Sequence, residues 1–223
     1  FPDHTILGEQ GVEPGTEAAD RALKEAYDAA QLWIVDPIDG TTNFVHSFPF
    51  FCVSIALAQR GELKLGVIYD PIMDEWFIAE KGKGATLNGE RLSVSKEARL
   101  AESLVASGFP RGEDGEPRDS HAVNAKALFA LLPRVRNIRT AGSAALNLAY
   151  VAAGRLSAFW EYALSVWDIA AGVLMIEEAG GRVSDTLGRP YDLGVRHIVG
   201  TNGLIHDALI DTLSEAGATE IGT

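Results

Sequence analysis

The chain has 223 residues, 47% of them hydrophobic and 22% charged, values that are ordinary for a globular protein with a substantial core. Its formal net charge of −12 argues against binding to duplex nucleic acid, which depends on lysine and arginine. Its apolar runs, such as 53–58, are too short to span a membrane, and no signal-peptide pattern is present, so we expect no membrane partner. A single cysteine, Cys52, fits a cytoplasmic location.

The first half of the chain reads mostly as strands. A short strand at 5–7 is followed by a helical pattern over 16–30, with Thr16 as its N-cap. Apolar and β-branched runs then alternate with turn residues, at 32–36, 51–59, 63–69 and 75–80. Connections this short predict an antiparallel meander.

The second half alternates between strands and helices. We expect strands at 104–109, 137–140, 156–162 and 197–201, and helices at 122–132, 143–153, 168–179 and 205–216. This order predicts a mixed sheet covered by helices. The chain is therefore expected to form two stacked subdomains, an antiparallel-sheet unit at 1–100 and an α/β unit at 101–223.

The segment W-I-V-D-P-I-D-G-T-T-N-F at 33–44 holds two acids, Asp36 and Asp39, at the end of an apolar strand. Two carboxylates so placed repel each other unless a cation lies between them. Gly40 permits a sharp turn, and a short helix beginning at Thr41 would offer free N–H groups to a phosphate. The alternative interpretation is a hairpin turn at Asp39-Gly40 with Thr42 as a helix cap, and spacing alone favours neither.

Two further acids are weaker signals when taken singly. Asp168, in W-D-I-A-A-G, stands at the head of an expected helix and is typical of an N-cap, a role that still leaves one oxygen for a metal. Glu9, in G-E-Q, follows the first strand and is typical of a solvated acid. With Asp36 and Asp39 they form the hard oxygen set that magnesium prefers. The motifs contain no histidine or cysteine, which argues against zinc.

These motifs resemble those of the inositol monophosphatase family, within the wider lithium-sensitive, magnesium-dependent phosphatases. The matches are D-P-I-D-G-T-T-N at 36–43, W-D-I-A-A-G at 167–172, G-E-Q at 8–10 (G-E-E in the family), F-V-H-x-F-P-F at 44–50 and K-G-K-G-A-x-x-N-G at 81–89. The resemblance covers essentially the whole chain. It implies an α+β fold, a layered αβαβα sandwich of the sugar-phosphatase type.

The resemblance also implies functional residues. Two or three Mg²⁺ ions would be held by Glu9, Asp36, the Ile38 carbonyl, Asp39 and Asp168. Catalytic roles fall to Thr41, Asp39 and Glu9, with Thr41 orienting the attacking water. Substrate contacts fall to Asp39, Gly40, Thr41, Gly142, Ser143, Ala144, Glu161 and Asp168. Without the resemblance, Glu161 would read as a solvated charge at the end of a strand.

The chain departs from the family pattern at three places. Gln10 replaces a common glutamate, which removes a negative charge beside the metals and predicts weaker metal affinity. The stretch between Glu9 and Asp36 is longer than usual and suggests a helical insertion. The family's N-terminal helices, which carry an acid that pairs with the threonine matched by Thr41, are expected upstream of Phe1.

The implied reaction is hydrolysis of a small sugar or polyol phosphate by metal-activated water. Glu161 and the Thr41-Thr42-Asn43 run favour an inositol phosphate. Fructose-1,6-bisphosphate, histidinol phosphate and adenosine 3′,5′-bisphosphate are alternative substrates for the same chemistry. A non-catalytic regulatory homologue is the alternative of another class. The resemblance further implies a homodimer that lithium inhibits.

Overall fold

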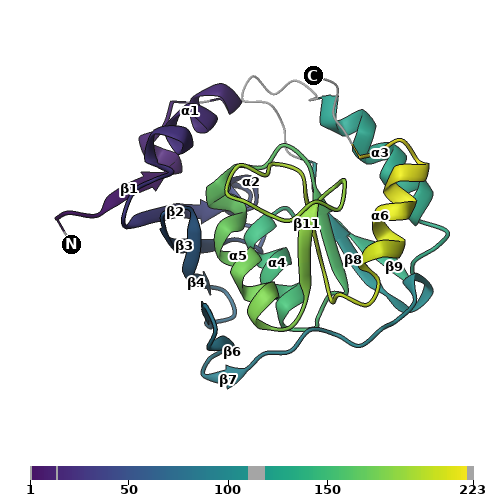
Figure 1. Cartoon of the computed structure of the whole chain (residues 1–223). Helices are drawn as coiled ribbons and strands as arrows, with labels where there is room; N and C mark the ends of the chain where they lie inside the picture. Colours follow the sequence, from purple (N-terminus) through teal and green to yellow (C-terminus); the bar gives the residue numbers. More distant parts are fainter. Residues whose placement is uncertain (1, 14, 110–118, 220–223) are drawn as a thin grey trace.

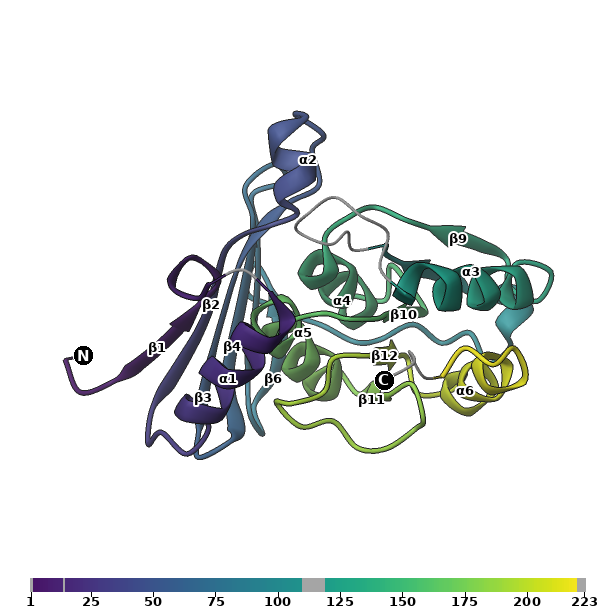
Figure 2. The same ribbon diagram turned by 90° about the horizontal axis from the view of Figure 1, so that it is seen from above.

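The computed structural model describes residues 2–13, 15–109 and 119–219, and within them the strands form a seven-stranded and a five-stranded sheet (Figure 1). Seen from above, the elements lie in layers: the larger sheet, a helix pair, the smaller sheet and an outer helix pair (Figure 2). The predicted α+β sandwich is confirmed for these layers. Among the described residues no helix is both long and apolar enough to cross a membrane.

The larger sheet follows chain order. Its strands are β1 (Thr5–Gly8), β2 (Leu32–Asp39), β3 (Cys52–Gln59), β4 (Glu62–Asp70), β5 (Glu75–Glu80), β6 (Gly84–Leu87) and β7 (Glu90–Arg91). From β2 onward all neighbours are antiparallel, which confirms the predicted meander. The exception is β1, which pairs in parallel with β2 because helix α1 (Thr16–Ala26) carries the chain back between them. Strands β6 and β7 were not predicted.

The smaller sheet is mixed, as predicted, with the order β11-β12-β10-β8-β9. Its strands are β8 (Leu104–Ser107), β9 (Asn137–Arg139), β10 (Ala158–Glu161), β11 (Arg182–Asp185) and β12 (Ile198–Thr201). Strand β11 was not predicted. Helices α3 (Asp119–Leu131) and α6 (His206–Glu215) pack on its outer face, over a core that includes Trp160 and Leu209.

Helices α4 (Ala144–Ala152) and α5 (Val166–Glu178) form the layer between the sheets, and nearly all their residues are buried. Two glycines, which have no side chain, let α5 approach its neighbours closely. A β-carbon on Gly66 of β4 would lie 2.8 Å from the Ala171 carbonyl oxygen, and one on Gly172 would overlap with Leu148 of α4. The A-A-G half of the W-D-I-A-A-G motif is therefore a packing surface, which fixes where the N-terminus of α5 lies.

Candidate metal centre

A β-bulge brings Asp36 and Asp39 to the same face of the larger sheet. Asp36 pairs with Ser54 and Asp39 with Cys52, so three residue steps on β2 match two on β3. In a regular strand, residues three apart point to opposite faces. The extra residue corrects this, and both carboxylates point toward the central helices, only 3% and 7% exposed. The strand runs on to Asp39, so the alternative of a hairpin turn at Asp39-Gly40 is wrong.

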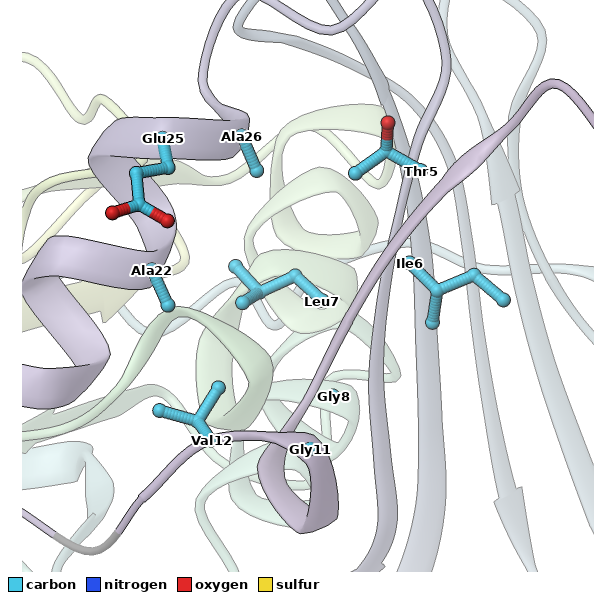
Figure 3. A pocket seen from close by; sticks show the side chains of 9 residues that line it. All are labelled: Thr5, Ile6, Leu7, Gly8, Gly11, Val12, Ala22, Glu25 and Ala26. Carbon is cyan, nitrogen blue, oxygen red and sulfur yellow. The ribbon is translucent and has the colours of Figure 1, made fainter.

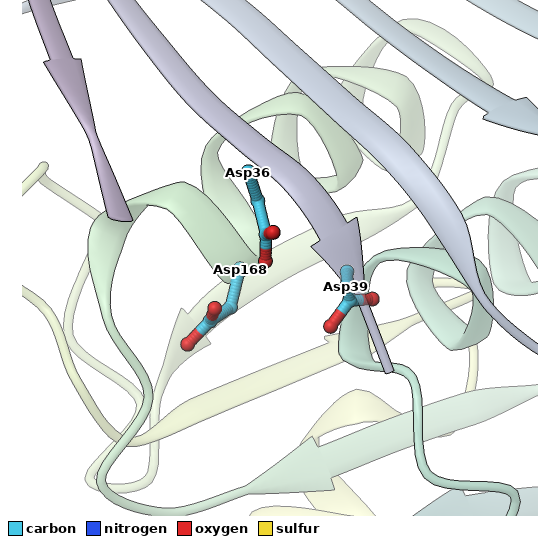
Figure 4. A group of neighbouring side chains, drawn as sticks. All are labelled: Asp36, Asp39 and Asp168. Carbon is cyan, nitrogen blue, oxygen red and sulfur yellow. The ribbon is translucent and has the colours of Figure 1, made fainter. Parts of the chain in front are cut away.

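Asp168 completes the group from the opposite side. Oxygen atoms of Asp36, Asp39 and Asp168 all lie within 4.8 Å of one another, and Figure 4 shows the three side chains around one small space. Asp36 and Asp39 lie in the second half of β2, which ends at Asp39, and Asp168 lies in the first turn of α5. The predicted convergence of acids that are distant in the sequence is thus seen for these three.

The prediction that Asp168 is the N-cap of α5 is wrong. The helix begins two residues earlier, at Val166, and Ser165 is its N-cap. Asp168 occupies the third helical position, where its Oδ2 accepts a hydrogen bond from the backbone N–H of Ser165 (2.7 Å). This hydrogen bond is one of the two that make up a capping box, here with aspartate in place of the usual glutamate. One carboxylate oxygen is thereby fixed.

Asp39 is fixed by the start of α4. Its Oδ2 accepts hydrogen bonds from the hydroxyl of Ser143 and from the backbone N–H of Ala145 (2.8 Å). Ser143 also caps α4, since its Oγ accepts from the N–H of Leu146 (3.2 Å). A single serine therefore orients both a helix and a carboxylate of the acidic group.

The electrostatics of the group call for a cation. Burial, and then the charges of Asp39, Asp168 and Glu9, raise the pKa of Asp36 to about 9. Burial is also the main reason why the pKa of Asp39 rises to about 6 and that of Asp168 to about 7. Within the described part of the chain, no lysine or arginine forms an ion pair with these carboxylates. A divalent cation would reverse all three shifts, so an all-oxygen site of this kind fits magnesium.

Glu9 and Ile38 lie nearby but are less clearly part of the site. Glu9, in the 3₁₀ turn η1 (Glu9–Gly11), falls outside the group of acids within 4.8 Å, although its charge acts on Asp36 and Asp168. The carbonyl of Ile38 accepts a hydrogen bond from the Thr41 hydroxyl (3.0 Å), which leaves one lone pair for a metal. Their roles as metal ligands stay predictions.

Two loops meet beside the acids. Gly40 has a φ of 92°, and a β-carbon there would lie 3.2 Å from the carbonyl oxygen of Gly142. Asn43 ties the loops together, because its Nδ2 donates to the carbonyls of Phe50 and Ala141, both at 2.7 Å. The predicted short helix, α2 (Thr41–Val45), and the Gly142–Ala144 turn are therefore neighbours. This linking role of Asn43 could not be predicted from the sequence, because its partner at Ala141 is 98 residues away.

Glu161 ends β10 and is 7% exposed, so the alternative of a solvated strand-end charge is wrong. Burial, and then the charges of Asp39 and Asp168, raise the pKa of Glu161 well above its usual value. The charges of Asp39 and Asp168 therefore act on the Glu161 carboxylate, and its role in substrate binding stays a prediction.

A cavity of about 290 Å³, whose lining includes none of the three aspartates, lies between β1, η1 and α1 (Figure 3). Its lining is mostly apolar, with Leu7, Val12 and Ala22 facing inward and Glu25 as its acid. It contains none of the residues assigned to chemistry. The reaction site is therefore assigned from the carboxylates rather than from this cavity.

Comparisons with known proteins agree with this geometry. Residues 1–218 match the model of the inositol monophosphatase family. The chain is 45% identical to inositol monophosphatase 2 of Solanum lycopersicum, over 97% of the chain and 78% of the relative. It is 44% identical to Nus factor SuhB of Pseudomonas aeruginosa (96% and 75%) and 41% identical to fructose-1,6-bisphosphatase/inositol-1-monophosphatase of Thermotoga maritima (100% and 77%).

A solved structure supports the same relationship. The inositol monophosphatase from Anabaena superposes with a TM-score of 0.83 at 39% identity, over 96% of this chain and 80% of that one. The chain belongs to the inositol monophosphatase family and, as a member of it, is a phosphatase.

Proposed function

We propose that this phosphatase is magnesium-dependent and that its preferred substrate is a myo-inositol monophosphate. The observation that carries the proposal is the group of Asp36, Asp39 and Asp168, in which the first two are buried and the third is partly buried. No lysine or arginine of the described residues forms an ion pair with these carboxylates. Magnesium bound there would neutralise phosphoryl oxygens and lower the pKa of a water molecule. Metal binding would also explain how a protein with a net charge of −12 accepts an anionic substrate.

The metal-binding residues we propose are Glu9, Asp36, Asp39, Asp168 and the carbonyl of Ile38. Oδ2 of Asp39 is held by Ser143 and Ala145, and Oδ2 of Asp168 by the Ser165 N–H. Each of these two carboxylates therefore has one oxygen engaged and the other available to a cation. Their orientation is set before any metal arrives, which reduces the cost of ordering the site.

The substrate would lie between the two loops and β10. Backbone N–H groups at Gly40 and Thr41 begin a helix and suit the phosphate. The Thr41 hydroxyl donates to Ile38, so its oxygen remains an acceptor that can orient a water molecule. On the far side, the Gly142–Ala144 turn and Glu161 would bind the hydroxyl groups of the ring, since a carboxylate accepts hydrogen bonds from alcohols.

The test is phosphate release by the purified protein from myo-inositol 1-phosphate, fructose-1,6-bisphosphate, histidinol phosphate and adenosine 3′,5′-bisphosphate. Each substrate is assayed after chelation and again after addition of Mg²⁺. We expect release to require the metal and kcat/KM to be highest for the inositol phosphate. Equal release in chelator and in Mg²⁺ would contradict the proposed chemistry, whereas a different best substrate would contradict only the proposed preference.

Two relatives favour alternatives that the same assay separates. The name of the Thermotoga relative favours fructose-1,6-bisphosphate as a further substrate. The Pseudomonas relative is named as a Nus factor, which favours a regulatory role. Magnesium-dependent turnover of any substrate in the panel shows catalysis, and its absence across the panel favours the regulatory alternative.

The proposal includes three properties that rest on family resemblance. We expect a homodimer, checked by light scattering, and inhibition by millimolar lithium in the phosphate-release assay. We also expect a cytoplasmic location, which the free, buried thiol of Cys52 fits. Fractionation of the source cells tests this last point.

A further inference from the structure

Strands β8 and β10 lie side by side and in parallel, and the register pairs Ser107 with Trp160. Trp160 belongs to the outer core under α3, whereas the residue before it, Phe159, belongs to the core shared with α4 and α5. Side chains alternate between faces along a strand. Glu161 and its neighbour Gly108 therefore follow on the inner face, which is the face of the three aspartates.

Gly108 leaves the space that the Glu161 carboxylate fills. A β-carbon on Gly108 would lie closer than 3.0 Å to Oε1, Oε2 and Cδ of Glu161, which is closer than real carbon contacts. The backbone does not demand glycine here, because Gly108 is not among the residues with positive φ. The lack of a side chain at this position therefore serves the neighbouring carboxylate.

The side chain of Asn124, on α3, holds both strands at this point. Its Nδ2 donates to the carbonyl of Gly108 (2.5 Å), and its Oδ1 accepts from the indole N–H of Trp160 (2.9 Å). Asn124 is 1% exposed and Trp160 is fully buried. One amide thus fixes Gly108 and the residue directly before Glu161, which sets the distance between the glycine and the carboxylate.

We propose that Gly108, held by Asn124, is a positioning residue that sets where the Glu161 carboxylate meets the hydroxyl groups of the substrate. This inference rests on the proposed function and deepens it. The role is separate from metal binding, since Gly108 faces Glu161 rather than the group of three aspartates. The group that a new β-carbon would meet is the end of a flexible side chain. Gly108→Ala should therefore displace the carboxylate and leave the strand in place.

The experiment compares two substrates and two backgrounds. With myo-inositol 1-phosphate, Gly108→Ala should raise KM by about tenfold, the cost of one charge-assisted hydrogen bond, with a smaller change in kcat. With p-nitrophenyl phosphate, which has no ring hydroxyls, its kcat/KM should change by less than about twofold, below the weight of one hydrogen bond. In a Glu161→Ala background, Gly108→Ala should have no further effect on either substrate.

A purely structural role for Gly108 would lower kcat/KM for both substrates, and the loss would persist in the Glu161→Ala background. Either result would overturn the inference. Asn124→Ala is the second variant, and it should raise KM for the inositol phosphate while Mg²⁺-dependent turnover of p-nitrophenyl phosphate is kept. If the wild-type protein shows no Mg²⁺-dependent turnover of either compound, the proposed function itself fails, which is a distinguishable outcome.

Discussion

Two buried polar groups in this protein differ in whether their members have partners. His206, the first residue of α6, is fully buried, with its Nε2 2.9 Å from the hydroxyl of Ser184 on β11 and its Nδ1 3.0 Å from the hydroxyl of Thr201 on β12. Both ring nitrogens are therefore satisfied. In the second group Asp36 and Asp39 are buried and Asp168 is partly buried, yet the three carboxylates face one another.

A binding site can be recognised among buried polar residues by whether the charges of its members are compensated. A network such as that of His206, in which every donor and acceptor has a partner, stabilises the fold and leaves no group free to bind a ligand. Buried like charges destabilise the fold until a ligand of opposite charge arrives. The aspartates thus predict a ligand, and the histidine network does not.

The largest expected effect comes from changing the acidic group. Asp36→Asn should lower Mg²⁺-dependent turnover by more than about 100-fold, since changes to outer-shell residues alone cost about 10- to 100-fold. The same change should stabilise the chelated protein by on the order of 2 kcal/mol, because it removes a buried carboxyl whose pKa is raised. Steady-state kinetics and urea unfolding measure the two effects. Near-wild-type turnover would refute the metal site.

The matched change in the histidine network should lower stability and leave turnover almost unchanged, the opposite of what is expected for Asp36→Asn. His206→Ala should destabilise the protein by about 3 kcal/mol, because it leaves a cavity and two hydroxyls without their partner. Turnover per folded molecule should stay within about twofold of wild type, because the variant touches no group of the site. Loss of turnover in fully folded His206→Ala would contradict the view that the histidine network is structural and only the aspartates serve catalysis.

The two groups should also respond to pH in opposite directions. The pKa of His206 is lowered to about 4, mainly by burial, so its contribution is present above pH 6.5 and is lost as the pH falls toward 4. The raised pKa of Asp36 makes the chelated protein lose stability as the pH rises from about 4 to about 9. In the chelated protein the two effects oppose each other between pH 4 and 6.5, and above pH 6.5 only the aspartate effect remains, so the unfolding midpoint should fall from pH 6.5 to 9. With Mg²⁺ this alkaline loss should disappear, and the acid loss from His206 should remain. An alkaline loss that Mg²⁺ leaves unchanged would argue against the site.

The smallest expected effect is at Ser143, which supports the acidic group and caps α4. Ser143→Ala should lower stability by about 1 kcal/mol through loss of the cap. It should also weaken Mg²⁺ binding several-fold, because Asp39 loses the donor that favours its ionised form. Calorimetric titration with Mg²⁺ measures the affinity, and Ser54→Ala, on the same face of the sheet, is the control. Equal Mg²⁺ affinity in wild type and Ser143→Ala would contradict the claim that Ser143 supports metal binding by Asp39.

Much of the fold could be predicted from local patterns. The meander and the central helices follow from alternating and helical runs of apolar residues, which are local signals. The parallel pairing of β1 could not be predicted, because it depends on where α1 returns the chain. The start of α5 was misplaced, since Ser165 and Asp168 can each serve as a cap and tertiary packing of the helix decides between them.

The candidate site was predicted in part for the same reason. Asp36, Asp39 and Asp168 carry charges whose burial requires an explanation, so the sequence pointed to them. The bulge that aligns Asp36 with Asp39 depends on the register with β3, which the sequence does not show. The parts played by Asn43, Ser143 and Gly108 depend on distant partners and were visible only in the structure.

The hydrogen bond from Asn43 to Ala141 has a consequence for folding kinetics. It joins points 98 residues apart, and closing so long a loop is entropically costly, so this contact should form after the rate-limiting step. A metal ion that needs Asp36, Asp39 and Asp168 together would then bind only once folding is nearly complete. Magnesium should slow unfolding and leave the refolding rate almost unchanged, so that the bound ion increases the kinetic stability of the native state.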